Sequence, residues 1–186
     1  MSNPIPKSDD DIPDESVTKR FCGVIEEMMW KPSSSEMSTG SLSIAPGDSL
    51  TLAAMIAACR FTRPPNPDIN ERNFPLTGSP VADVADMLTV SQKDLGGQNM
   101  TTSEIEAAID RKGFRPATLA EQLVYAKEKW NGKDWIAALG SSWVGPGGFR
   151  GVPYLFEGDG GRLLLLYWGS PECRWLGVGL FLVVRK

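Results

Sequence analysis

The chain has 186 residues, a net charge of −4 and a hydrophobic content of 41%, which is ordinary for a globular protein. The acidic balance disfavours general nucleic-acid binding, because proteins that neutralise phosphates usually carry a basic excess. The sequence contains no histidine, which excludes Ser-His-Asp and Cys-His catalysis and every histidine-containing zinc or haem site.

The N-terminal arm, residues 1–45, is predicted to be flexible and acidic. It contains four basic and eight acidic side chains, so it carries the whole net charge of the chain. Within the arm, residues 17–30 can form a short helix that places Phe21, Ile25 and Met28 on one side. Two interpretations of this apolar stripe stay open: it packs against the body of the protein, residues 46–186, or it binds a partner.

Neither a secretory signal nor a membrane span is predicted. The N-terminus lacks a basic start followed by an apolar core, and no apolar run approaches the roughly 20 residues of a membrane helix. The three cysteines, Cys22, Cys59 and Cys173, are far apart and form no CxxC pair. We therefore expect a soluble cytoplasmic protein whose cysteines are small buried side chains. The sequence leaves open whether two of these distant cysteines form one disulfide.

Three helices are predicted before the C-terminal third. The first spans residues 46–59, and Asp48 or Ser49 is expected to accept hydrogen bonds from its first free amides. The other two begin at capping boxes, in which a threonine and a glutamate three residues later satisfy each other's backbone amides. These boxes are Thr101–Glu104 and Thr118–Glu121.

From Trp135 onward the hydrophobic period changes to that of β-strands. Ten of the 16 aromatic residues lie between Trp130 and the C-terminus, in segments separated by glycine-rich and proline-rich turns of hairpin length. Strands are expected at 135–144, 152–157, 162–168 and 175–185, with turns at 145–148, 158–161 and 169–171. A further strand is expected at the end of 81–91, and residues 114–116 should be extended. The predicted fold is α+β, with helices followed by an antiparallel meander.

Three segments of the C-terminal half together resemble a known family. They are Gly113–Thr118 with Ala120-Glu121 and Tyr125-Ala126, then Gly140-Ser141-Ser142-Trp143, and finally Leu180–Arg185. Their order resembles the C-type-lectin-like fold of the formylglycine-generating, sulfatase-modifying family, over residues 113–186. The oxidase activity of that family depends on a C-terminal cysteine pair that holds copper. This chain has only Cys173 there, so the resemblance implies the architecture and neither the activity nor the cofactor.

Residues 46–186 also resemble a set of uncharacterised bacterial proteins. The corresponding segments are Gly113–Thr118 with Glu121 and Leu123, Ala138–Ser141 with Trp143, and Leu180–Lys186. This resemblance implies a shared architecture and carries no activity with it.

Ten residues are candidates for ligand binding. Arginine beside an aromatic ring can create a stacking site for sugars or bases, whereas the alternative is that the aromatic residues form the core and the arginines face solvent. Arg115 and Glu121 are expected to form a structural ion pair at a helix start. Asp159 lies in a glycine-rich segment that is typical of a plain turn, and neither a metal nor a cofactor is predicted. The candidates are Arg115, Glu121, Trp143, Arg150, Tyr154, Asp159, Arg162, Trp168, Arg174 and Trp175.

These patterns indicate a non-enzymatic recognition domain that binds a protein or a small polar ligand. The expected binding surface is formed by the loops 145–150, 158–161 and 169–174. Two alternatives stay open: a hydrolase or transferase whose general base is a carboxylate with a shifted pKa, and an accessory component of a bacterial or phage assembly.

Overall fold

The structure is a computed structural model that describes residues 51–76, 81–158, 161–175 and 179–186. Within these ranges it contains three α-helices and a mixed sheet of seven strands, so the predicted α+β class is confirmed. The predicted arm, its helix at 17–30 and the candidate Asp159 lie outside the described residues. None of the described helices has the length and hydropathy needed to cross a membrane.

The described helices are α2 (Leu52–Ala58), α3 (Thr102–Arg111) and α4 (Leu119–Glu128), and a 3-10 turn, η1 (Val84–Asp86), precedes the first strand. Both predicted capping boxes are confirmed. The cap of the first described helix is Thr51, whose side chain accepts a hydrogen bond from the Ala54 amide. The predicted cap residues Asp48 and Ser49 lie outside the described residues.

The strands are β1 (Met87–Ser91), β2 (Phe114–Pro116), β3 (Ile136–Ala137), β4 (Trp143–Val144), β5 (Arg150–Gly158), β6 (Gly161–Trp168) and β7 (Leu180–Arg185). The main path through the sheet is β1–β7–β3–β5–β6. The short strand β3 lies between β7 and β5. Beyond it, β2 continues along β7 and β4 continues along β5, so the centre of the sheet is shared by three short strands.

The sheet differs from the predicted meander in three ways. The predicted strand 135–144 is divided into β3 and β4. The chain leaves β6 and crosses the sheet, so that β7 lies between β1 and β3 rather than beside β6. One pair, β3 with β7, is parallel. The physical reason is the composition of β7, whose consecutive apolar residues require cover on both faces and therefore a central position.

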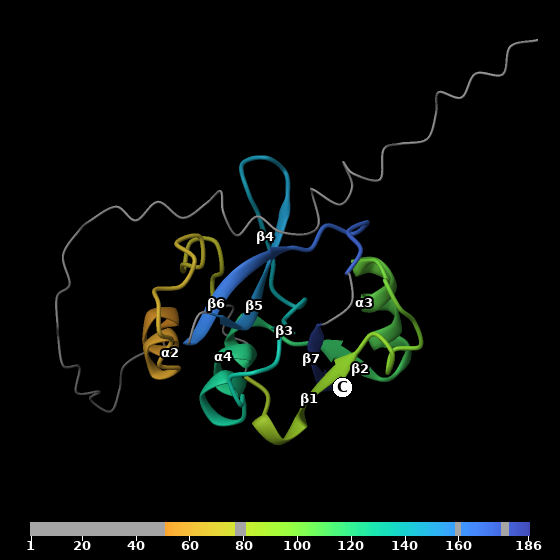
Figure 1. The fold of residues 1–186 in the computed structure, drawn as a ribbon, viewed down its shortest axis with the longest axis horizontal. Coiled ribbons are helices and arrows are strands. Elements are labelled where there is room, and N and C mark those ends of the chain that lie inside the picture. The colour runs from red at the N-terminus through yellow and green to blue at the C-terminus, as the bar shows by residue number, and fades with distance from the viewer. Residues whose placement is uncertain (1–50, 77–80, 159–160, 176–178) are drawn as a thin grey trace, which may run out of the picture. The chain divides into compact units, whose positions relative to one another are not determined.

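The two faces of the sheet have separate cores. Leu182 and Val184 of β7 face α2 and α4, while Phe181 and Val183 face α3. This alternation follows from the two-residue period of a strand. Figure 1 shows α2 and α4 on one side of the strands and α3 on the other.

The division between β3 and β4 depends on a close backbone contact at Gly140. Its amide donates to the Ala117 carbonyl oxygen at 2.9 Å, just before α4 begins. A Cβ at this position would lie 2.6 Å from that oxygen and 2.7 Å from the Pro116 carbonyl oxygen. Backbone atoms cannot move aside as a flexible side chain can, so only glycine fits here.

We expect Gly140→Ala to lower the free energy of unfolding by about 2 kcal/mol, because the added methyl group forces the two backbone segments apart. Urea denaturation followed by tryptophan fluorescence measures this change. Gly179→Ala is the matched control, since a Cβ there meets nothing within 4 Å. Equal stability of the two variants would contradict the proposed role of the contact.

Candidate functional site

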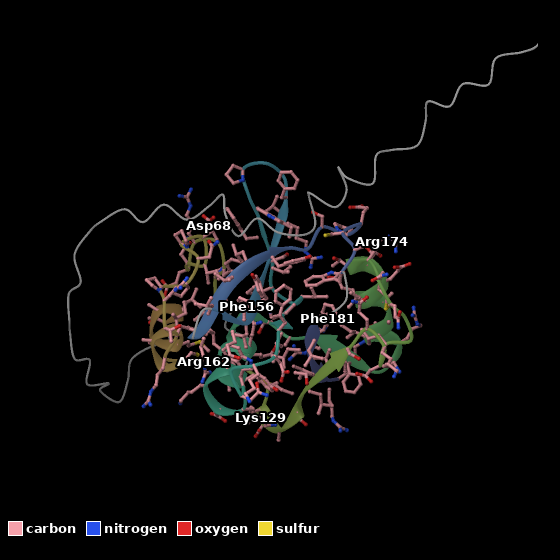
Figure 2. All side chains as sticks on the ribbon, in the orientation of Figure 1. Asp68, Lys129, Phe156, Arg162, Arg174 and Phe181 are labelled. Atoms are coloured by element: carbon pink, nitrogen blue, oxygen red, sulfur yellow. The ribbon has the colours of Figure 1, made fainter. Side chains whose placement is uncertain are left out.

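The nine candidate residues that the structure describes lie at five separate places rather than in one site. Arg115 and Glu121 meet at the start of α4, and Tyr154 and Trp175 lie in the core beneath α3. Two further candidates lie on opposite sides of the sheet. Figure 2 shows Arg162 on the side of α2 and α4 and Arg174 on the side of α3. The remaining three, Trp143, Arg150 and Trp168, lie together at one end of the β5–β6 hairpin.

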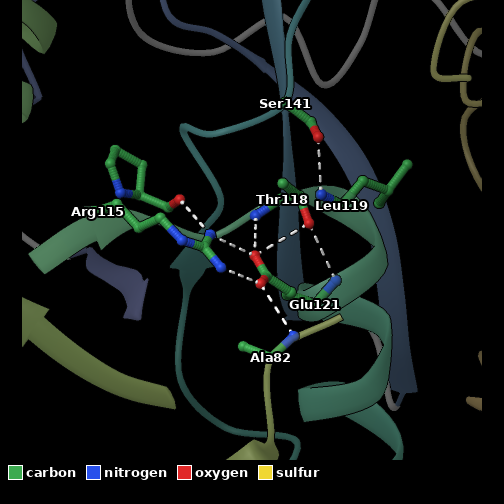
Figure 3. A network of polar contacts seen from close by, with 7 residues as sticks. Ala82, Arg115, Thr118, Leu119, Glu121 and Ser141 are labelled. Atoms are coloured by element: carbon green, nitrogen blue, oxygen red, sulfur yellow. Dashed lines mark hydrogen bonds and ion pairs between the residues drawn. The ribbon is translucent and has the colours of Figure 1, made fainter. Parts of the chain in front are cut away.

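The first place is a polar network around the buried carboxylate of Glu121 (Figure 3). Arg115 binds it with two nitrogens, Nη2 at 2.5 Å from Oε1 and Nη1 at 2.9 Å from Oε2. The Thr118 amide and hydroxyl donate to Oε2 at 2.8 and 3.0 Å, and the Ala82 amide donates to Oε1 at 3.3 Å. The next free amide of the helix, that of Leu119, donates to the Ser141 Oγ at 2.9 Å.

This network makes Glu121 a structural anchor and not a proton acceptor. Its side chain is only 2% exposed, and burial alone raises the pKa of a carboxyl group. The hydrogen bonds from Arg115, Thr118 and Ala82 outweigh that effect and hold the pKa of Glu121 below its ordinary value. Five donors occupy its two oxygens, which leaves little acceptor capacity for a substrate. The predicted structural ion pair is present.

The second place is the aromatic core on the α3 face. Trp175 is 6% exposed, its ring lies 5.0 Å from that of Phe181, and its Nε1 donates to the Thr102 Oγ1 at 2.9 Å. Tyr154 is 8% exposed and stacks against Trp135 at 5.5 Å. Tyr154 and Trp175 therefore belong to the hydrophobic core, as the alternative to a ligand-stacking site predicted.

Arg162 makes the arginine–aromatic contact that the sequence suggested, although its partner is different from those expected. Its guanidinium lies 4.7 Å from the ring centroid of Trp130 and donates to the Ala126 carbonyl oxygen in the last turns of α4. The Trp130 ring is 5% exposed, so this stacking attaches the helix to β6 and leaves no open ring face for a ligand.

Arg174 borders a shallow open depression beside α3. Its Nη1 donates to the Asn99 carbonyl oxygen at 2.9 Å, and Arg111 and Gln98 are among the other lining residues. The depression of about 540 Å³ is open to solvent. The structure shows no buried polar group directed into it among the described residues.

The fifth place, the hairpin end, combines an ordered base with exposed apolar side chains. Arg150 at the base donates to the Glu106 carboxylate at 2.8 Å and to the carbonyl oxygens of Leu139 and Gly169 at 3.1 and 3.3 Å. Figure 1 shows the loop between β4 and β5 projecting beyond the neighbouring elements. We call the apolar side chains of this end the hairpin patch. Its members are Trp143, Val144, Phe149, Leu166 and Trp168.

The hairpin patch includes residues that the sequence analysis did not single out. Val144 is 64% exposed and Phe149 is 46% exposed, and the Phe149 ring packs edge-on against Trp168 at 5.5 Å. Gly151, opposite both Trp143 and Trp168, leaves room for the larger neighbouring rings. One feature of the sequence could have indicated this patch: Phe149 directly follows the turn Gly145–Gly148, where a polar residue is usual.

The three predicted binding loops do not form one surface. The loops at 145–150 and 169–174 lie at the same end of the β5–β6 hairpin, where the Gly169 amide donates to the Arg150 carbonyl oxygen. The turn that joins β5 to β6 lies at the other end, about 26 Å away along a strand of nine residues. A single ligand therefore contacts at most the first two loops.

The described cysteines and carboxylates offer no metal centre. In the ranges that the structure covers, no group of three or more cysteine, aspartate or glutamate side chains is placed to hold an ion. Cys59 and Cys173 are buried and form no disulfide, as expected for small core residues, whereas Cys22 lies outside these ranges.

We expect Glu121→Gln to lower the free energy of unfolding at pH 7 by about 2 kcal/mol, because the Arg115 charge loses its partner. The folded pKa of Glu121 is depressed below its ordinary value of 4.5. Its contribution is therefore present above that value and is lost as the pH falls through the folded pKa. Urea titrations between pH 7 and pH 3 should show a steeper loss in the wild type than in Glu121→Gln.

The matched control for this prediction is Glu104→Gln, which changes the corresponding residue of the α3 capping box. Glu104 is exposed and binds the Thr101 amide, so we expect this variant to cost less than about 1 kcal/mol. If the two variants lose the same free energy of unfolding, the Glu121 network stabilises the protein no more than an ordinary helix cap does, which contradicts the prediction.

Cys59 should resist alkylation in the folded protein. Burial raises the pKa of its thiol to about 11, and the Sγ donates to the carbonyl oxygens of Met55 and Leu123 at 3.3 and 3.2 Å. At pH 8 only about 0.1% of this thiol is ionised. Iodoacetamide labelling followed by peptide mass spectrometry should modify Cys59 in urea and leave it unmodified in buffer. Comparable rates in both conditions would contradict its burial.

Comparison of the chain with protein-family models, curated proteins and solved structures gives no match, so its function is inferred from the geometry described above.

Proposed function

We propose that the chain is a non-enzymatic recognition domain that binds a protein partner through the hairpin patch. The observation that supports the proposal is the exposure of Val144 and Phe149 on a projecting hairpin. Only four large hydrophobic side chains are exposed among the described residues, and two of them flank this one turn. Solvent-exposed apolar side chains that gather on one element are typical of protein interaction sites.

The base of the hairpin supports such a role because it is held in place before any partner arrives. Arg150 ties β5 to α3 through Glu106 and to the chain after β6 through Gly169. A rigid support lowers the conformational entropy that is lost on binding. Aromatic side chains on a rigid support are common among the residues that dominate binding energy.

The chemistry of the hairpin patch favours a protein over a small polar ligand. The charged side chain at its base, Arg150, is already engaged by Glu106 and by two carbonyl oxygens. The ring surfaces of Trp143, Phe149 and Trp168 instead favour apolar side chains of a partner. An accessory role in a larger assembly uses the same surface, and it is distinguished by the identity of the captured protein.

The hydrolase or transferase alternative finds less support. Such an enzyme needs an accessible carboxylate to act as general base. The most buried candidate, Glu121, is occupied by five donors, and Glu106 is paired with Arg150.

We expect Phe149→Ser to weaken partner binding by about 30-fold, because a ring at the centre of an interface contributes on the order of 2 kcal/mol. The full-length wild type and variant are immobilised separately and exposed to extract of the source cell, and bound proteins are quantified by mass spectrometry. A binding partner is a protein that the wild type retains and Phe149→Ser loses.

Val81→Ser serves as the matched control, because Val81 is 37% exposed and lies outside the hairpin patch. It should retain the same partner, and thermal denaturation should show that both variants are folded. Retention of every captured protein by Phe149→Ser would overturn the proposed surface. Turnover by the wild type against a panel of ester, glycoside and phosphoester substrates would favour the enzymatic alternative.

A further inference from the structure

Among the described residues, the segment 62–66 covers only part of the outer edge of β6. On its inner edge β6 pairs with β5 along all eight residues. On the outer edge, the Thr62 amide donates to the Arg162 carbonyl oxygen at 2.9 Å and the Asn66 amide donates to the Leu164 carbonyl oxygen at 3.2 Å. The segment 62–66 therefore protects the first half of this edge, with the help of Pro64 and Pro65.

The second half of the edge has its backbone groups directed outward. In an antiparallel pair, alternate residues point their amide and carbonyl groups toward the partner strand and away from it. Arg162 and Leu164 point away from β5, so Leu166 and Trp168 do so as well. Across this edge the structure gives Leu166 and Trp168 no backbone partner among the residues it describes, and both are partly exposed.

We propose that the edge of β6 at Leu166 and Trp168 binds an extended segment of the partner, which adds a strand to the sheet. This inference rests on the proposed function and specifies how the partner is held. Donors and acceptors that recur every second residue, about 6.8 Å apart, match the backbone of another strand. The chemistry of the edge thus identifies its ligand as an extended peptide.

The hairpin patch adjoins this edge and adds side-chain contacts to it. Trp168 belongs to both, and Phe149 packs against its ring. Side chains of an added strand alternate between the two faces of the sheet, so every second residue lies next to Trp168 and Leu166. The partner segment is therefore apolar at alternate positions.

The length of the open edge also limits the partner. An added strand meets the segment 62–66 when it reaches Leu164, so it must be short. A second copy of this chain that paired symmetrically about Leu166 would place its Trp168 opposite Leu164, whose carbonyl oxygen already binds Asn66. That register is therefore closed to a second β6 edge, whereas a short peptide segment can pair with Leu166 and Trp168 without reaching Leu164.

Amide hydrogen exchange measured by NMR on the full-length chain tests the inference. In the free protein, the Leu166 and Trp168 amides should exchange faster than those of Leu165 and Tyr167, which point toward β5. The probe is a capped heptapeptide of alternating valine and threonine. On its addition, exchange at Leu166 and Trp168 should slow by about tenfold or more.

The matched control probe is the same peptide with N-methyl groups on two adjacent central residues, which removes an amide from each edge of the strand. It should protect neither amide. On the protein side, Leu166→Pro removes the outward donor without removing a hydrogen bond to β5 and should weaken peptide binding by about tenfold. Leu166→Thr keeps the amide and should bind within a few-fold of the wild type.

Failure of this inference is distinguishable from failure of the proposed function. If a partner that depends on Phe149 binds without protecting Leu166 and Trp168, the edge is not used although the hairpin patch is. If the same amides become protected as the concentration of the pure chain rises, the occupant is a second copy. Equal binding of the methylated and unmethylated peptides would also overturn strand addition, and this readout requires no variant to fold.

Discussion

The start of helix α4 is the point on which the rest of the described structure depends. There the Glu121 carboxylate joins Arg115 of β2 to the helix and to the chain before β1, while Gly140 brings the central segment against Ala117. A buried carboxylate is tolerated only where donors surround it, and here the helix cap and the arginine supply them. The segments that follow β2 and precede β4 meet at this point through the hydrogen bonds from Gly140 to Ala117 and from Leu119 to Ser141.

The three segments on which the predicted resemblances were based meet at this place. Residues 113–118 form β2 and the cap of α4, residues 138–143 contain the Gly140 contact and Ser141, and residues 180–186 contain β7, which pairs with β2 and β3. Each segment alone has an ordinary composition. Their shared position explains why the neighbours Gly140 and Ser141 act as one structural unit with Glu121 of the preceding segment.

The same architecture separates support from recognition. The arginines at 115, 150 and 162 bind a carboxylate or carbonyl oxygens within the fold, which leaves them engaged in holding elements together. At the projecting end of β4 and β5, Val144 and Phe149 instead expose apolar surface to solvent. In the proposed function, the contacts of Arg150 fix the position of the hairpin, and the exposed apolar side chains and the open edge of β6 supply the contact with a peptide.

The elements that neighbouring residues specify could be predicted from the sequence alone. Both capping boxes, the extended Arg115-Pro116 segment and the Arg115–Glu121 pair follow from neighbouring residues, because a cap or a proline acts within one turn of the chain. Only the folded structure shows that β7 is central, that the predicted strand 135–144 divides and that the candidate residues occupy five places. These features depend on contacts between residues far apart in the sequence, such as Gly140 with Ala117 and β3 with β7, for which a single sequence carries no periodic signal. The exposure of Phe149 belongs to the same class, since a local pattern predicts an apolar side chain but not whether the fold covers it.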